Sequence, residues 1–163
     1  FTLMFLVKHP DKLSKLRSEL DFATATNPCG SLPTYEQIRK LPYLTGCINE
    51  SMRLHPVTTL GLPREVTEDV VMNNYYFPKG TKLLVQLALL HLSEEYFPQA
   101  TEYIPERWIP EESPFPPVEA FTYYPFSAGS RICIGKNLAM MEMRLVLAAL
   151  VRTYDMELVP NQR

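Results

Sequence analysis

The stretch Phe126-Ser127-Ala128-Gly129-Ser130-Arg131-Ile132-Cys133-Ile134-Gly135 decides the fold, and a long apolar segment with helical spacing follows it directly. A cysteine in a loop just before a helix lies where backbone N–H groups point at the sulfur and the helix dipole favours negative charge, so a thiolate is stabilised. Gly129 and Gly135 allow the backbone to bend sharply and a flat ligand to approach closely. The stretch therefore predicts a ligand-binding cysteine loop.

Two further side chains narrow the chemistry of this loop. Phe126 supplies a ring that shields the sulfur of Cys133, and Arg131 supplies a fixed positive charge. These residue types suit a large, partly anionic cofactor bonded through sulfur, and a haem iron fits that description. A lone cysteine is more often a buried core thiol, so the residue types alone leave both roles of Cys133 open.

The spacing Phe126-x-x-Gly129-x-Arg131-x-Cys133-x-Gly135 resembles the haem-binding signature of the cytochrome P-450 haem-thiolate monooxygenases and is complete at every defining position. The resemblance implies a mainly α fold with small β-sheets, of which this chain is the C-terminal third. It also implies haem b, with Cys133 as the axial ligand of the iron and Phe126 packed against it. Because the chain opens on Phe1 inside an apolar helical pattern, we expect a fragment whose N-terminal part is missing.

Composition bounds the class of protein. The 163 residues are 46% hydrophobic, enough for one domain with a core, and the formal net charge of −2 gives no reason to expect nucleic acid. Cys29, Cys47 and Cys133 are widely separated, so neither a disulfide framework nor a zinc site is indicated, and a reducing compartment is expected. The longest apolar run, Leu83 to Leu92, is interrupted by polar residues and is too short for a membrane span.

Hydrophobic periodicity and proline positions divide the chain into segments. Leucines at helical spacing and a capping-box pattern at Thr34-x-x-Gln37 predict helices, whereas seven prolines between Pro98 and Pro125 exclude regular helix or sheet interior there. An asparagine pair at 73–74 predicts a hairpin turn. The prediction is helices over 1–25, helix with Glu-x-x-Arg over 34–54, a small β-sheet over 57–87, a meander over 98–125, the haem-binding loop over 126–135, a helix buried on most sides over 134–152, and a final strand over 154–159.

Glu50 and Arg53 lie three apart on one helical face and can pair, which at an exposed site contributes only about 0–1 kcal/mol. They resemble the family's Glu-x-x-Arg motif, and Pro105-Glu106-Arg107-Trp108 resembles the loop whose arginine completes that triad. The resemblance implies that Glu50, Arg53 and Arg107 form a buried charge network with a structural role. Removal of one member of such a network costs on the order of 3–5 kcal/mol.

Further matches concern the surroundings of the haem. Val57-Thr58-Thr59-Leu60 resembles the family's segment that contacts substrate, and its small and apolar side chains suit a lipophilic ligand, although a plain edge strand has the same composition. Arg64 and Arg131 match positions from which arginine reaches a haem propionate, with a surface arginine as the alternative. His91 ends an apolar run and is expected to be a hydrogen-bonded packing residue rather than a ligand.

The resemblance implies a monooxygenase that takes electrons from an NADPH-dependent reductase or another electron donor, activates O₂ and inserts one oxygen atom into a lipophilic substrate at the cytosolic face of the endoplasmic reticulum. Lys136, with Lys12, Lys15 and Arg17, is a candidate for the reductase-docking face, and a solvated helix face explains the same residues. A haem-thiolate isomerase or dehydratase and a catalytically inert haem-binding fragment stay open as alternatives. Because the family's central oxygen-activating helix is absent, we expect these residues alone to be inactive.

Overall fold

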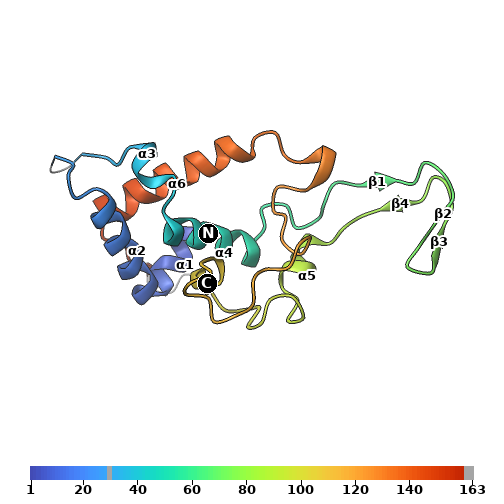
Figure 1. Cartoon of the computed structure of the whole chain (residues 1–163), viewed down its shortest axis with the longest axis horizontal. Coiled ribbons are helices and arrows are strands. Elements are labelled where there is room, and N and C mark those ends of the chain that lie inside the picture. Colours follow the sequence, from blue (N-terminus) through green and yellow to red (C-terminus); the bar gives the residue numbers. More distant parts are fainter. Residues whose placement is uncertain (29–30, 160–163) are drawn as a thin grey trace.

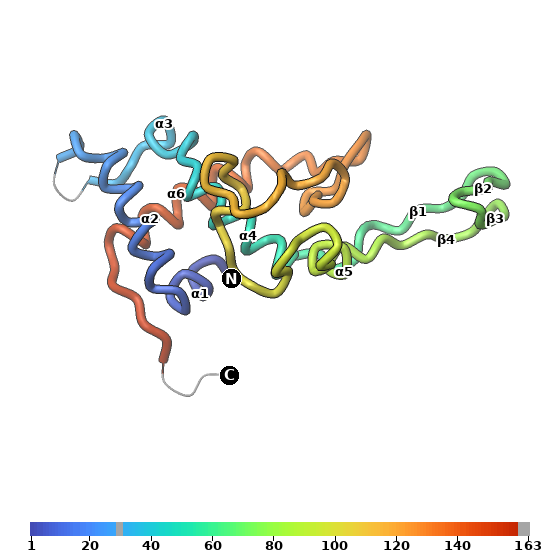
Figure 2. The backbone as a smooth tube through the Cα atoms, turned by 60° about the horizontal axis from the view of Figure 1, so that its bottom comes forward, coloured from blue at the N-terminus to red at the C-terminus, as the bar shows by residue number. Residues whose placement is uncertain are grey.

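The computed structural model describes residues 1–28 and 31–159 and shows a helical body from which a narrow β arm projects (Figure 1; Figure 2). The predicted class, mainly helical with small antiparallel sheets, is confirmed. Cys29 lies outside the described residues. The elements in order are α1 (Thr2–Lys8), α2 (Pro10–Ala23), α3 (Tyr35–Ile38), α4 (Pro42–Leu54), β1 (Arg64–Glu65), β2 (Val70–Met72), β3 (Tyr75–Phe77), β4 (Lys82–Leu83), α5 (Leu87–His91), the 3-10 helices η1 (Pro105–Trp108) and η2 (Gly129–Arg131), and α6 (Lys136–Thr153).

Local chemistry fixes where the first helices begin. Pro10 and Pro42 occupy the first turns of α2 and α4, where the missing N–H of proline costs no hydrogen bond. Thr34 precedes α3, and its N–H donates to Oε1 of Gln37 at 2.9 Å, as the capping-box pattern predicts. In α2 the buried side chains Leu13, Leu16 and Leu20 form one face, which packs into the common core.

Helix α4 is the centre of the body. Nearly every side chain from Tyr43 to Leu54 is buried, and the helix contacts α1, α2, α5, α6 and, most extensively, η1. The approach of η1 is close because position 46 is glycine. A Cβ added to Gly46 would lie 2.6 Å from the backbone oxygen of Pro105, a distance that real Cβ atoms do not reach. A helical glycine therefore allows η1 to lie directly on α4.

The β arm consists of two separate antiparallel ladders. β1 pairs with β4, and β2 pairs with β3 through a turn in which Asn73 (φ 48°) and Asn74 (φ 65°) are left-handed, so the predicted hairpin is confirmed. The return strand expected to reach residue 87 is wrong, because β4 ends at Leu83 and a helix begins at Leu87. Leu87 and His91 are one helical turn apart and both are buried, so this segment buries its apolar side as helix α5.

Helix α6 corrects two predictions about 134–152. It begins at Lys136, and it is not buried on most sides: Leu138 within it is exposed, and so is Ile134, where the helix was expected to start but which precedes it. Its buried residues are Met140, Leu147, Ala148 and Val151. Among the described residues α2, α3 and α4 pack against this helix and leave part of its apolar surface open. Residues 154–159 form no strand, because no neighbouring strand in the described chain pairs with them.

The proline-rich segment before the cysteine loop is irregular except for η1, yet aromatic hydroxyls tie it to α4. The hydroxyl of Tyr103 donates to the Cys47 carbonyl at 3.0 Å, and that of Tyr123 to the Asn49 carbonyl at 3.0 Å. These bonds order a segment that has no backbone ladder of its own. Within residues 1–28 and 31–159 no helix is both long and apolar enough to cross a bilayer.

Candidate functional site

The cysteine loop joins the irregular segment to α6 and is closed by backbone hydrogen bonds. The N–H of Cys133 donates to the Phe126 carbonyl at 2.8 Å, and the N–H of Lys136 donates to the Cys133 carbonyl at 3.2 Å. Gly129 has φ +68°, with nothing within 4 Å of an added Cβ, so glycine provides the sharp bend and leaves open space beside it. The loop thus fixes the backbone of Cys133 from both sides.

The sulfur of Cys133 is exposed, unlike the thiol of Cys47. Burial raises the pKa of Cys47 to about 12, so that thiol stays protonated and unreactive near neutral pH. The predicted N–H donors toward the Cys133 sulfur are not formed in the described chain, because the Lys136 N–H bonds to the Cys133 carbonyl instead. A Cβ on Gly135 would lie 3.8 Å from Sγ, an ordinary contact, so the sulfur itself does not require glycine there.

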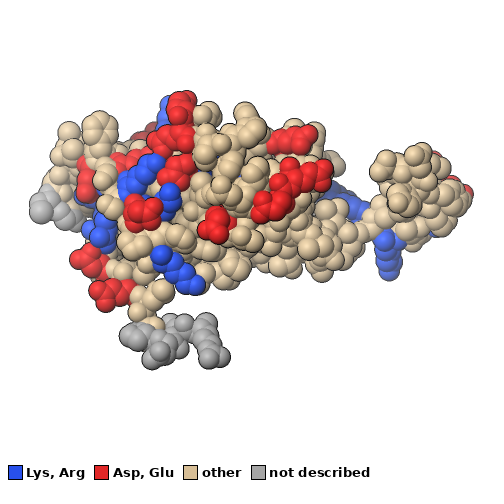
Figure 3. Space-filling view, turned by 90° about the horizontal axis from the view of Figure 1, so that it is seen from below, with Lys and Arg blue, Asp and Glu red and all other residues tan. Residues whose placement is uncertain are grey.

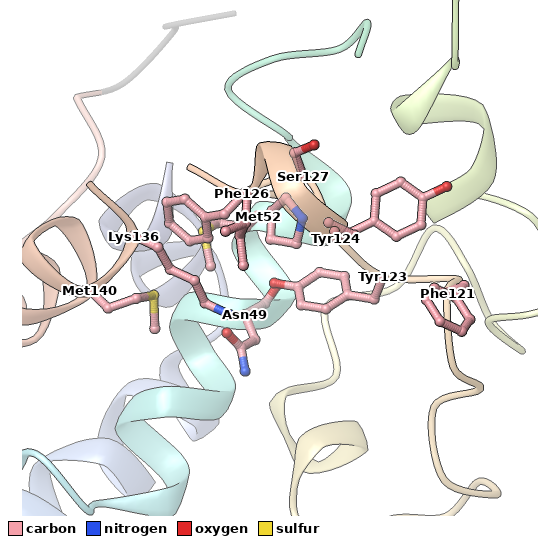
Figure 4. Close-up of a pocket in the computed structure, with 13 residues that line it drawn as sticks. Asn49, Met52, Phe121, Tyr123, Tyr124, Phe126, Ser127, Lys136 and Met140 are labelled. Carbon is pink, nitrogen blue, oxygen red and sulfur yellow. The ribbon is translucent and has the colours of Figure 1, made fainter. Parts of the chain in front are cut away.

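A cavity of about 330 Å³ lies beside the loop (Figure 4). Phe126 lines it and also packs against the core cluster, so its ring supports the loop from inside. In Figure 4 the Lys136 side chain extends from the start of α6 toward Asn49 of α4. The cavity is lined by residues of α4, the loop and α6: Asn49, Met52, Phe121, Tyr123, Tyr124, Pro125, Phe126, Ser127, Ala128, Gly129, Ile132, Lys136 and Met140.

The remaining predicted haem and substrate residues lie apart from one another. Arg131 is exposed in η2 and Arg64 is exposed in β1 at the base of the arm, and within the described residues neither makes an ion pair. The stretch Val57-Thr58-Thr59-Leu60 is exposed, with an isolated bridge from Leu60 to Gln86 and a hydrogen bond from the Ala88 N–H to the Thr59 carbonyl at 3.2 Å. Both arginines are thus accessible to an anionic group, and the stretch is accessible to a ligand.

Glu50, Arg53 and Arg107 are brought together in the interior. The Glu50 carboxylate is fully buried, and it accepts from Arg53 Nη2 at 2.8 Å, Arg53 Nε at 3.0 Å and Arg107 Nε at 3.4 Å. The indole N–H of Trp108 donates to its second oxygen at 2.9 Å, and the N–H of Ile104 donates to the first at 3.2 Å. One carboxylate therefore organises α4 and both ends of η1.

The guanidinium groups of Arg53 and Arg107 also donate hydrogen bonds to backbone carbonyls. Arg53 donates to the carbonyls of His91 (2.9 Å), Ala100 (2.6 Å) and Glu102 (3.1 Å), and Arg107 donates to that of Pro98 (2.8 Å). The His91 carbonyl is at the end of α5, and the other three carbonyls belong to a segment without regular structure, so the arginines replace the backbone ladder that this segment lacks. The network shapes the whole connection from α5 to η1.

A second cluster of charged residues surrounds Glu106 and was not predicted from the sequence. Lys12 and Lys15 of α2 donate to its carboxylate at 3.2 and 3.1 Å, and the Tyr43 hydroxyl donates at 3.1 Å. Burial opposes the ionisation of Glu106, but its own backbone N–H, Lys15 and Lys12 outweigh burial and lower its pKa. Lys15 also bonds to Glu112. The two lysines are more than 90 residues from Glu106 in sequence and Tyr43 is 63 residues from it, so no local pattern indicates them.

Three of the basic residues expected at the reductase-docking face are paired within the protein. Lys12 and Lys15 are engaged by Glu106, and Arg17 pairs with Asp155 at 2.8 Å and donates to the Val151 and Tyr154 carbonyls. On the face shown in Figure 3, acidic and basic side chains gather in mixed groups over the helical body. Of the four basic residues singled out from the sequence, Lys136 is the exposed one that borders the loop cavity.

The residues of the loop fit a haem bonded through sulfur. Cys133 presents an exposed soft ligand on a backbone that is held in place, and Gly129 leaves open space where a side chain would obstruct a flat ring. Among the described residues no three His, Cys, Asp or Glu side chains gather as a metal-binding set.

Fold and loop together define a class: a mainly helical chain that carries an exposed cysteine on a hydrogen-bonded loop and a buried Glu–Arg–Arg network in its interior. The family model of cytochrome P450 matches residues 1–163, and the chain belongs to the cytochrome P450 family. Membership of this family implies a haem cofactor.

Curated relatives support the same assignment. The chain is 41% identical over 166 residues to cytochrome P450 monooxygenase mpsF of Macrophomina phaseolina, covering 99% of this chain and 40% of that protein. It is 40% identical over 162 residues to cytochrome P450 monooxygenase acrD of Aspergillus aculeatus (99% and 32%). A third relative, probable cytochrome P450 12c1, mitochondrial, of Drosophila melanogaster, is 39% identical over 162 residues (95% and 30%). The chain thus spans between 30% and 40% of the length of these relatives.

Proposed function

We propose that this chain is the proximal, haem-binding part of a haem-thiolate monooxygenase that inserts one atom of O₂ into a lipophilic organic substrate. The observation that carries the proposal is the exposed sulfur of Cys133 on a loop closed by the Phe126 and Lys136 backbone bonds. An accessible thiol whose backbone is hydrogen-bonded on both sides is suited to hold a metal in one position.

Specific residues of the chain would hold the haem. Cys133 would ligate the iron, Phe126 would support the loop behind it, and Arg64 and Arg131 would pair with the propionates, since a guanidinium matches a carboxylate through two hydrogen bonds. A haem with a thiolate ligand supplies electron density that favours O–O bond cleavage. The part of these residues is to bind, orient and neutralise the cofactor.

Two exposed parts of the chain support the proposed substrate class and electron donor. Val57-Thr58-Thr59-Leu60 is accessible and mostly uncharged, which supports contact with a lipophilic molecule. Lys136 beside the loop cavity supports an approach of an acidic surface of an NADPH-dependent reductase. We propose the cytosolic face of the endoplasmic reticulum as the location of the protein. Localisation by microscopy tests this, and a mitochondrial location, which the name of the Drosophila relative gives for that protein, would contradict it.

The absorption of the reduced carbon monoxide complex tests the assignment. The full-length protein loaded with haem is expected to show a thiolate-type Soret band, and Cys133→Ala is expected to abolish it. Cys47→Ala is the matched control, because that cysteine is buried away from solvent and its removal is expected to leave the band. A band that survives Cys133→Ala would refute the ligand assignment. Product analysis with a reductase then separates oxygen insertion from isomerisation or dehydration, and a haem-loaded protein without either product is the inert alternative.

A further inference from the structure

His91 contacts both the buried charge network and the segment that leads to the cysteine loop. Its ring is fully buried among Phe97, Tyr123 and Tyr124, with centroid separations of 6.4, 5.2 and 6.4 Å. Its carbonyl accepts a hydrogen bond from Arg53 Nη1 at 2.9 Å, and its ring Nε2 accepts one from the Tyr124 N–H at 3.4 Å. A single residue therefore joins α4 to residues 121–126.

From Tyr124 the bonds continue to the cysteine. The Tyr124 carbonyl accepts from the N–H of Ser127 at 3.0 Å, and the carbonyl of the preceding residue, Phe126, accepts from the N–H of Cys133 at 2.8 Å. The ring of His91 is thus the one side-chain acceptor, among the described residues, for the backbone between Thr122 and Cys133. Its hydrogen bond fixes residues 121–126, the stem that leads into the cysteine loop.

This arrangement requires a neutral imidazole. Because Nε2 accepts a hydrogen bond, the proton of the neutral ring is on Nδ1. This nitrogen is buried and has no hydrogen-bond partner in the described chain. A second proton would remove the acceptor and place a new cation beside Arg53. The titratable groups that face the ring are Arg53 of α4, whose charge Glu50 balances, and Tyr123 and Tyr124 of the stem. Burial, and then the charge of Arg53, lower the pKa of His91 to about 4.

We propose that His91 is a positioning residue for Cys133: its neutral ring holds the stem 121–126 against the Glu50 network and so sets the place of the cysteine loop. The inference rests on the proposed function in one respect, since it takes Cys133 as the ligand of the haem. It assigns to a fully buried histidine a role in the stability of the thiolate ligation.

Three variants of the full-length, haem-loaded protein test this. His91→Leu removes the acceptor, His91→Gln keeps an acceptor that does not titrate, and Leu87→Ala truncates a buried neighbour on the same helix that makes no hydrogen bond to the stem. The first measurement is hydrogen exchange of the Tyr124 amide relative to amides of α2. We expect an increase of about threefold to tenfold in His91→Leu, the equivalent of one lost hydrogen bond, and no relative increase in the other two variants.

The second measurement is the pH at which the thiolate-type Soret band of the reduced carbon monoxide complex is lost. Acid effects at every other position are common to all variants, so the difference between variants isolates His91. We expect His91→Gln to keep the band to lower pH than the wild type. Unchanged Tyr124 exchange in His91→Leu, or identical acid midpoints for the wild type and His91→Gln, would overturn the proposal, and the Gln comparison holds if the Leu variant does not fold.

The two proposals fail in distinguishable ways. If the wild type shows no thiolate-type band, or if the band survives Cys133→Ala, the proposed function is wrong. The exchange of the Tyr124 amide does not depend on haem ligation, so it still decides whether His91 fixes the stem. If the band behaves as expected but its acid midpoint ignores His91, the function stands and the positioning role falls.

Discussion

Arg53→Ala tests the buried network most directly. The substitution leaves Glu50 fully buried with one guanidinium in place of two, and breaking such a pair costs about 3–5 kcal/mol. It also removes the donors to the carbonyls of His91, Ala100 and Glu102, and each carbonyl left buried without a partner costs about 1–3 kcal/mol more. Because whole domains are stable by only about 5–15 kcal/mol, we expect a loss of about 5 kcal/mol or more and a large fraction of unfolded protein.

The chain contains a matched control with the same spacing. Glu36 and Arg39 are also three apart on a helix and pair at 2.6 Å, but their side chains are 75% and 42% exposed, so Arg39→Ala is expected to cost about 0–1 kcal/mol. Urea unfolding of the full-length protein, followed by circular dichroism, measures both variants. A loss of 1 kcal/mol or less for Arg53→Ala, similar to that of Arg39→Ala, would refute the reasoning about burial.

Three further predictions concern packing, charge and pH. Gly46→Ala is expected to lower stability by about 1–3 kcal/mol in thermal unfolding, because the new Cβ would strike the Pro105 backbone, whereas the same change at an open helical site raises stability. Glu106→Gln is expected to cost about 1–2 kcal/mol at low ionic strength and less in 1 M salt, and an equal cost in both would contradict an electrostatic role. For His91, the unfolded chain takes up a proton near pH 6.5 and the folded chain only near pH 4, so the unfolding free energy falls as pH is lowered between these values, by about 3 kcal/mol. Urea unfolding at pH 7 and pH 5 should show the part of this loss that falls above pH 5, about 2 kcal/mol, in the wild type and a smaller loss in His91→Gln.

Local chemistry made much of the fold predictable. Pro10 and Pro42 start helices, Thr34 with Gln37 starts a third, and the asparagine pair forms its turn, because each feature depends only on neighbours in sequence. The exposure of Ile134 and Leu138 was not predictable, because periodicity shows which face of a helix is apolar and not whether another element covers it. The strand expected over 154–159 was wrong for a related reason, since a strand needs a partner that its own sequence does not specify.

In the candidate site, too, contacts between sequence neighbours were predictable and contacts between distant segments were not. Glu50 and Arg53 are visible as a pair from spacing, but their burial and their link to Arg107 came from a resemblance, and the structure supplies the distances. The cluster around Glu106 had no signal, because its lysine partners lie on a helix more than 90 residues earlier. The contact of the His91 ring with the Tyr124 backbone was likewise out of reach, since it depends on how two irregular segments meet in space.

The neighbours Glu106 and Arg107 of η1 serve different partners: the first binds lysines of α2, and the second binds the carboxylate of α4. The order of these two charges along the chain therefore matters more than their net charge. An exchange of the two side chains would leave composition and net charge untouched, yet it would set a guanidinium against two ammonium groups and a carboxylate against Glu50. It also follows that α2 cannot separate from α4 without straining one short turn from both sides, so the three elements should open as a single cooperative unit when the protein is heated or pulled.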